Sequence, residues 1–136
     1  EGKKMRIGEL AKKTGVDVPT IRYYELERLL APPPRSSAGY RQYEATHLET
    51  LQFIRHCRSL DISLSEIRML LDYRENPELA CDAVNQLIAL HIDQVRDRIT
   101  QLQQLEEQLL ALQGRCGEQR YAKDCGILES LKCSVG

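Results

Sequence analysis

Cysteine is the residue type in this chain with the clearest potential for chemistry. Among the 136 residues there are five cysteines, Cys57, Cys81, Cys116, Cys125 and Cys133, and four of them lie beyond residue 80. An odd number of cysteines, without an apolar secretory stretch in the first residues, argues against a disulfide framework and indicates reduced thiols. Thiolates are soft donors that bind soft or borderline metal ions. The clustering therefore predicts a metal site.

A long helix must separate these cysteines. Residues 82–113 contain neither proline nor glycine, and 32 helical residues would span roughly 48 Å at 1.5 Å per residue. Cys81 and Cys116, at the two ends of this segment, would then lie roughly 50 Å apart within one chain, too far to share an ion.

Apolar residues recur along this segment in steps of three and four, which is typical of a coiled coil. We call this row the seam; its members are Ile88, Ile92, Val95, Ile99, Leu102 and, after one phase slip, Leu105, Leu109 and Leu112. Such a stripe would face water on a lone helix, so it needs a partner, and a homodimer is the economical choice.

Charge is distributed unevenly between the two ends of the chain. The net charge is −1, but residues 1–43 contain nine Lys/Arg against five Asp/Glu, whereas residues 76–136 contain six against nine. This asymmetry favours a DNA-binding N-terminal part joined to a part that does not bind DNA. A solvated basic face is the alternative explanation.

The basic N-terminal part has the pattern of a helix-turn-helix. Ile7, Leu10 and Ala11 have amphipathic helical spacing, and Gly15 interrupts the pattern. Pro19 then occupies a first-turn position of a second helix, where its missing N–H has no consequence. Two short helices joined by a tight turn form the motif whose second helix can enter the major groove.

A β-hairpin, which we call the wing, is predicted over residues 35–43, after the helix-blocking prolines 32–34. Arg35 and Arg41 would lie on its arms and Tyr40 beside its turn; a plain surface turn is the alternative. Helices are then expected over residues 45–59 and, from a Ser63/Glu66 capping box, up to Asn76-Pro77.

Together, these motifs resemble the MerR family of metal-responsive transcription regulators. The likeness is carried by residues 7–11 (IGELA), 20–25 (TIRYYE), 29–30 (LL), 35–36 (RS), 39–43 (GYRQY) and 51–55 (LQFIR). The resemblance implies a mainly α fold, in which a winged helix-turn-helix DNA-binding domain is followed by a long antiparallel coiled-coil dimerisation helix. The corresponding domains are residues 1–75, a hinge and coiled coil over 76–113, and a metal-binding loop with a short C-terminal helix over 114–136.

The resemblance also implies a function. A homodimer would occupy the spacer of a bacterial promoter, repress without effector, and with effector distort the DNA so that RNA polymerase recognises both promoter elements. Arg22 is the best candidate for reaching base edges or phosphate, and most of the other contacts position the protein without reading sequence. The expected DNA-binding residues are Thr20, Arg22, Tyr24, Arg35, Tyr40, Arg41 and Arg58.

In an antiparallel dimer, the start of one long helix meets the end of the other. Cys81 can then join Cys116 of the partner subunit and Cys125 of the partner subunit around one ion, and the family places its metal there. Zinc sensors of the family carry a second cysteine beside Cys116, where this chain has Gly117. Copper and gold sensors have serine in place of Cys81, and a third thiolate suits a divalent ion.

The resemblance to the lead- and cadmium-responsive branch, through residues 53–61 and 125–128, favours Pb(II) or Cd(II) as the cofactor. Hg(II) and Zn(II) are the alternatives of the same class. Cys133 is a candidate extra ligand, a thiol that delivers metal, or a tail residue without a role. Cys57 is expected to be a packed small hydrophobe.

Other classes of function are less well supported by the sequence. An enzyme is not expected, because no phosphate-binding loop, nucleophile elbow or paired-carboxylate arrangement accompanies the cysteines. A thiol-based redox switch on the same DNA-binding frame is the more serious competitor. His47 and His56 are expected at the surface or between domains, and His91 in a structural hydrogen bond. No apolar run is long enough to cross a membrane, and a cytoplasmic location is expected.

Overall fold

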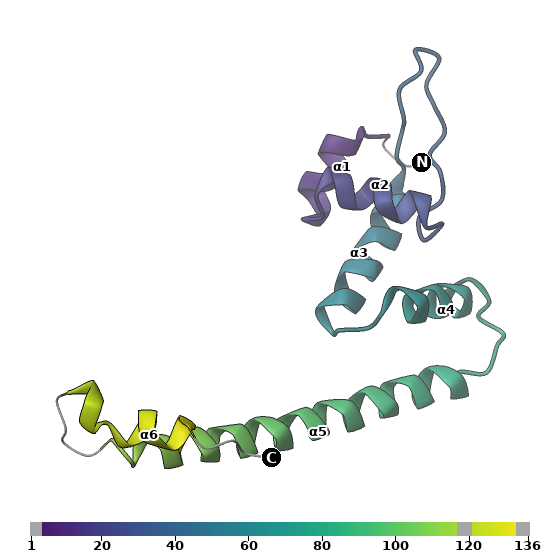
Figure 1. Cartoon of the computed structure of the whole chain (residues 1–136). Coiled ribbons are helices and arrows are strands. Elements are labelled where there is room, and N and C mark those ends of the chain that lie inside the picture. The colour runs from purple at the N-terminus through teal and green to yellow at the C-terminus, as the bar shows by residue number, and fades with distance from the viewer. Residues whose placement is uncertain (1–3, 117–120, 133–136) are drawn as a thin grey trace. The chain divides into compact units, whose positions relative to one another are not determined.

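The computed structural model describes residues 4–116 and 121–132. Its elements are all helical: α1 (Ile7–Thr14), α2 (Val18–Leu26), α3 (Ala45–Ser59), α4 (Leu64–Glu75), α5 (Asp82–Gln113), a 3₁₀ turn η1 (Ala122–Asp124) and α6 (Gly126–Lys132) (Figure 1). Over the described ranges, extended pairing is limited to two isolated bridges. The expected mainly α class, with a helix-turn-helix and a long C-terminal helix, is thus confirmed.

The chain divides into two compact units, residues 1–84 and 85–136. Each unit is described by itself below. The three-part division expected from the sequence stays a prediction.

The turn between α1 and α2 is built from local hydrogen bonds. Gly15 has a φ of +75°, which favours glycine, and its N–H caps α1 by donating to the Ala11 carbonyl at 2.8 Å. Asp17 then begins α2 by accepting from the Thr20 backbone N–H at 3.0 Å. Hydrogen bonding from Thr20, through its side chain and its backbone N–H, lowers the pKa of Asp17. The helix-turn-helix geometry therefore follows from signals next to each other in the sequence.

The wing is closed at two levels. Arg35 and Arg41 form an antiparallel bridge, and the Ser36 N–H donates to the Tyr40 carbonyl at 2.7 Å. At the base, Met5 and Tyr43 exchange two backbone hydrogen bonds of 2.8 and 2.7 Å. The pairing of Met5 with Tyr43 therefore joins the base of the wing to the chain just before α1 (Figure 1).

The core of the first unit draws on α1, α2, the base of the wing, α3 and α4. Its largest fully buried side chains are Tyr43, Leu10, Ile21, Leu30, Leu51, Ile54 and Ile67. Because α2 and the base of the wing both contribute side chains to this core, they are held together by the same packing.

His47 is buried in the first unit, which corrects the expectation that it lies at the surface or between domains. Its Nδ1 accepts from the Glu44 backbone N–H at 3.0 Å, and its Nε2 lies 3.1 Å from the Ala31 carbonyl oxygen. The ring also packs edge-on against Tyr43, with centroids 5.4 Å apart. His47 is inside because it satisfies backbone groups that the fold would otherwise bury unpaired. His56 is exposed.

The sequence predicted the boundaries of the later helices closely. The capping box of α4 is present: Ser63 N–H donates to Glu66 Oε1 at 2.9 Å, and Glu66 N–H donates to Ser63 Oγ at 3.2 Å. The 32-residue helix predicted over 82–113 is α5. Across the described residues, no helix is long and apolar enough to traverse a bilayer.

Candidate nucleic-acid interface and metal centre

Four arginines converge on one surface depression of the first unit, which we call the arginine depression. It is lined by Arg6, Arg22, Arg35 and Arg41, together with Ile7, Gly39 and Tyr40. Arg22 comes from α2, and Arg35 and Arg41 come from the two arms of the wing, whereas Arg6 directly precedes α1. No carboxylate is among the described residues that line it. The depression therefore presents concentrated positive charge to an anion.

One carboxylate lies behind this surface and joins the wing to α2. Glu25 of α2, with a side chain only 11% exposed, has its Oε1 atom 3.4 Å from Arg41 Nη1. Its Oε2 atom accepts a hydrogen bond from the Tyr43 hydroxyl. Burial, followed by the Glu25 hydrogen bond and charge, raises the pKa of Tyr43 to about 12. Glu25 therefore holds two residues of the extended segment in register with the helix that carries Arg22.

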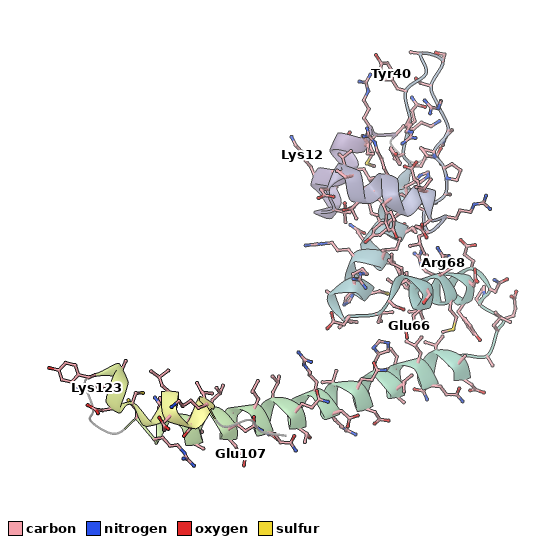
Figure 2. The ribbon with its side chains drawn as sticks, in the orientation of Figure 1. Lys12, Tyr40, Glu66, Arg68, Glu107 and Lys123 are labelled. Carbon is pink, nitrogen blue, oxygen red and sulfur yellow. The ribbon has the colours of Figure 1, made fainter. Side chains whose placement is uncertain are left out.

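Arg6 was not among the residues singled out from the sequence. Its guanidinium carbon lies 3.8 Å from the centroid of the Tyr40 ring, and Tyr40 lies near the tip of the wing (Figure 2). Local spacing gives no signal for this contact, because Arg6 precedes α1 whereas Tyr40 follows α2. The Met5–Tyr43 pairing brings the two residues together.

The remaining sequence-predicted DNA residues do not line the depression. The Thr20 side chain is hydrogen-bonded to Asp17, in the cap of α2. Tyr24 is only 8% exposed and belongs to the core, and burial raises its pKa although the nearby Arg58 opposes this shift. Arg58 is exposed and donates to the Ile62 carbonyl at 2.7 Å. For these three residues, DNA contact stays a prediction.

Two of the candidate metal ligands meet in the second unit. Cys116 follows α5 and Cys125 precedes α6, and the close contact of their neighbours Arg115 and Gly126 brings the two cysteines together. The pKa of the Cys125 thiol is lowered chiefly by backbone N–H groups of Leu128 and Ile127, which point at its sulfur, and further by Cys116. This arrangement, which we call the thiol pair, favours the thiolate that a soft metal ion requires.

A glycine makes the thiol pair sterically feasible. Gly126 packs so closely on the backbone of Arg115 that an added Cβ atom would overlap the Arg115 carbonyl group. Because Arg115 precedes Cys116 and Gly126 follows Cys125, this contact is what brings the two cysteines together. The glycine of the CGIL segment (residues 125–128) is therefore needed because a side chain would not fit at this position.

The other cysteines have separate environments. Cys81 is exposed and directly precedes α5. Within the described parts of a single chain, no three His, Cys, Asp or Glu side chains form a group that could hold a metal ion. Cys133 lies outside the described residues. Cys57 is buried among apolar residues, as predicted, and burial raises the pKa of its thiol.

Comparison with protein families identifies this architecture. The family description "MerR HTH family regulatory protein" matches residues 5–74, and "MerR, DNA binding" matches residues 48–112. The chain belongs to the MerR family. The two matches cover the helix-turn-helix, the wing, α3 and α4, and almost all of α5.

The similar MerR-family proteins include regulators named for several metals. A ZntR homolog from Haemophilus influenzae is 45% identical over 108 residues, which cover 79% of this chain and 80% of the relative. The mercuric resistance operon regulatory protein of Bacillus cereus is 38% identical over 128 residues, covering 94% and 97% of the two chains.

Among solved structures, the transcription regulator PbrR691 from Ralstonia metallidurans, in complex with lead(II), has 49% sequence identity and a TM-score of 0.83. The match covers 93% of this chain and 98% of that chain. A MerR from Bacillus megaterium, in complex with mercury(II), has 36% identity and a TM-score of 0.73, covering 95% and 100%.

Proposed function

We propose that this MerR-family protein is a heavy-metal-sensing transcriptional regulator. As a homodimer it binds a promoter spacer, and on binding Pb(II) or Cd(II) it activates transcription by distorting the DNA. The observation that carries the metal-sensing part is the thiol pair, in which the contact of Gly126 with Arg115 holds Cys116 next to Cys125 and the pKa of Cys125 is lowered. Two soft donors held together, one with a lowered pKa, form a partial site for a soft cation.

The DNA-binding role is supported by the arginine depression. Arg22 on α2 and Arg35 and Arg41 on the wing line it, and guanidinium groups bind phosphate through several donors in a fixed geometry. In this proposal Arg22, Arg35, Tyr40 and Arg41 contact DNA directly. Thr20, Tyr24 and Arg58 are the further contacts that the family resemblance implies.

The proposed dimer would cover the seam of α5. Seven seam residues, Ile88, Ile92, Val95, Ile99, Leu102, Leu105 and Leu109, are each 39–57% exposed in the single chain, and α5 contains no buried residue. A second copy in antiparallel orientation would remove this apolar surface from water. It would also bring Cys81 to Cys116 of the partner subunit and Cys125 of the partner subunit.

The choice of metal rests on the donor set and on the relatives. Three thiolates suit Pb(II), Cd(II) and Hg(II), and a fourth donor such as Cys133 would favour Cd(II) or Zn(II). Lead(II) is bound in the relative of 49% identity, and mercury(II) in one of 36% identity. We therefore place lead or cadmium first and mercury or zinc as alternatives.

Mixed dimers test the shared metal site directly. A Cys81→Ser protomer and a Cys116→Ser/Cys125→Ser protomer each lack ligands, but their heterodimer should contain one complete site. We expect tight Pb(II) binding to return only on mixing. Binding is measured by the sulfur-to-lead absorption band and by competition with Cd(II), Hg(II) and Zn(II). Cys57→Ala, outside the ligand set, is the control. If mixing restores nothing, the ion is not shared between subunits.

A run-off transcription assay tests the proposed regulation by bacterial RNA polymerase. Each ligand substitution should abolish metal-induced transcription while leaving DNA affinity nearly unchanged. Arg22→Ala should have the reverse effect, with weak DNA binding and unchanged metal affinity. Loss of DNA binding in all the cysteine variants would contradict this separation of roles.

A thiol redox switch is the second candidate, and the lowered pKa of Cys125 next to Cys116 is the observation that favours it. Oxidation by hydrogen peroxide would join the two sulfurs and reduce the peroxide to water. Mass spectrometry of the Cys116–Cys125 peptide pair, with transcription measured in the same samples, separates the candidates. A redox switch would respond to peroxide and be indifferent to Pb(II).

A further inference from the structure

Arg6 occupies an unusual position in the first unit. It is the residue that precedes α1, with an extended backbone (φ −85°, ψ 166°), and its side chain makes no cap for that helix. Its guanidinium instead stacks on Tyr40 of the wing, 3.8 Å from the ring centroid. Arg6 therefore bridges the start of the helix-turn-helix and the wing.

The stacking leaves the hydrogen-bonding capacity of Arg6 available. The N–H donors of a guanidinium lie in its own plane, so a ring stacked on its face does not consume them. Across the described residues, the Arg6 side chain contacts the Tyr40 ring and makes no hydrogen bond or ion pair. Tyr40 is 51% exposed, so the stack lies at the protein surface.

The other arginines of the depression are partly engaged. Arg35 donates to the Gly39 carbonyl at 3.0 Å, and Arg41 lies 3.4 Å from Glu25. Glu25 offsets one of the four positive charges of Arg6, Arg22, Arg35 and Arg41, so the group keeps an excess of about three charges. A cluster of this kind attracts a phosphodiester strongly, since each phosphate of DNA carries one negative charge.

We propose that Arg6 is a DNA-backbone contact and that the arginine depression receives one phosphodiester group. In this arrangement, the Tyr40 ring orients Arg6 by stacking on it. The phosphate is bound jointly by Arg6 before α1, by Arg22 of α2, and by the arginines of both arms of the wing. The inference rests on the proposed DNA-binding function and adds Arg6 to its contact set. Because the ligand is the backbone, Arg6 contributes to binding of any sequence.

The salt dependence of binding tests this assignment. Full-length protein is titrated into a fluorescent 30-base-pair duplex of unrelated sequence, and into a duplex that the wild-type protein selects from a random pool. For Arg6→Gln, we expect weaker binding to both duplexes and a slope of log K against log salt that is shallower by about 0.9 per protomer. Arg6→Lys keeps the charge and should retain most of the slope.

Two further variants separate contact from support. Tyr40→Leu removes the aromatic ring but keeps the charge of Arg6. DNA affinity should therefore fall, while the slope of log K against log salt stays closer to that of the wild type. Lys132→Gln removes one positive charge from exposed α6, in the other unit, and should change neither quantity. An unchanged slope for Arg6→Gln would overturn the proposal, and would leave Arg6 as a residue that only holds the wing.

Failure of this inference is distinguishable from failure of the proposed function. If Arg22→Ala weakens binding to the selected duplex and Arg6→Gln leaves the slope unchanged, DNA binding stands and the assignment of Arg6 is wrong. If the wild-type protein binds neither duplex, the DNA-binding function itself is wrong, and the inference falls with it.

Discussion

The Nη1 atom of Arg41, on the wing, lies 3.4 Å from the Oε1 atom of Glu25, on α2. The other oxygen of this carboxylate accepts a hydrogen bond from the Tyr43 hydroxyl. Glu25 is thus bound on both oxygens by residues of one extended segment. The consequence is that the wing and the helix carrying Arg22 are held in one arrangement before DNA is present. Such preorganisation lowers the ordering cost of binding.

Substitution of Glu25 should therefore change specificity more than total affinity. Glu25→Gln removes a negative charge near the arginine depression, so binding to a duplex of unrelated sequence should strengthen. The wing is less firmly held, so we expect the ratio of selected to unrelated affinity to fall by about tenfold, or about 1.4 kcal/mol. Fluorescence anisotropy with both duplexes measures this ratio.

Glu27→Gln is the matched control for Glu25→Gln. Glu27 follows α2, pairs with Arg68 at 3.7 Å and does not line the depression. The same loss of charge there should leave the ratio close to that of the wild type. Equal effects of the two substitutions would show that general charge, and not the Arg41 contact, matters.

The Tyr43–Glu25 hydrogen bond should appear as a pH dependence of stability. The pKa of Tyr43 is raised from about 10 to about 12 in the folded protein. Between these values the folded state keeps a proton that the unfolded state has lost, so the stabilisation is fully present below pH 10 and is lost as the pH rises towards 12. Urea denaturation at pH 9, 10 and 11 should show this decline.

Tyr43→Phe isolates the tyrosine contribution from that of other alkaline groups. The variant should be less stable at pH 8, because Glu25 loses a hydrogen bond, by about 1 kcal/mol. Its stability should then fall less steeply between pH 10 and 11 than that of the wild type. Parallel curves for the two proteins would contradict the raised pKa.

Gly126→Ala should disrupt the thiol pair. The added Cβ would overlap the Arg115 carbonyl group, so the segment must shift and the Cys116–Cys125 contact is lost. We expect Pb(II) affinity to fall by at least about tenfold, as for lost support of metal ligands, with little change in DNA affinity. Isothermal titration with Pb(II) measures the first quantity.

Gly114→Ala provides the comparison for Gly126→Ala. A Cβ at Gly114 would lie 3.5 Å from the Ala111 carbonyl oxygen, an ordinary van der Waals contact. The variant should bind Pb(II) as the wild type does. If both glycine substitutions weaken binding equally, then flexibility after α5, and not the Arg115 contact, controls the site.

Cys57 and Cys125 should differ in reactivity towards iodoacetamide. Cys57 is 7% exposed and burial raises the pKa of its thiol, whereas backbone N–H groups lower that of Cys125. In the metal-free native protein at pH 7.5, Cys125 should be alkylated more than about tenfold faster than Cys57, because the thiolate is the reactive form. Peptide mass spectrometry over time measures both rates.

Unfolding in guanidinium should abolish this difference, since both thiols are then exposed to water. Comparable rates for Cys57 and Cys125 in the native protein would mean that Cys57 is not enclosed in the core.

The sequence by itself determined the elements whose signals are local. The absence of proline and glycine over residues 82–113 predicted α5, and the Ser63/Glu66 capping box predicted the start of α4, because helix boundaries depend on neighbouring residues. The motifs of the N-terminal part, such as TIRYYE and GYRQY, were specific enough to predict the MerR family. The apolar periodicity predicted the seam but not the residues that cover it.

Only the tertiary structure decided which side chains meet. His47 was expected at the surface or between domains, yet it is buried, where it accepts from the Glu44 N–H and packs against the Tyr43 ring. Arg6 was not singled out, because its contact with Tyr40 depends on the pairing of Met5 with Tyr43. Glu25 was not singled out either, because its contact with Arg41 joins α2 to a separate segment. Residues separated along the chain come together only when a shared core aligns their backbones, and periodicity along one element carries no record of that alignment.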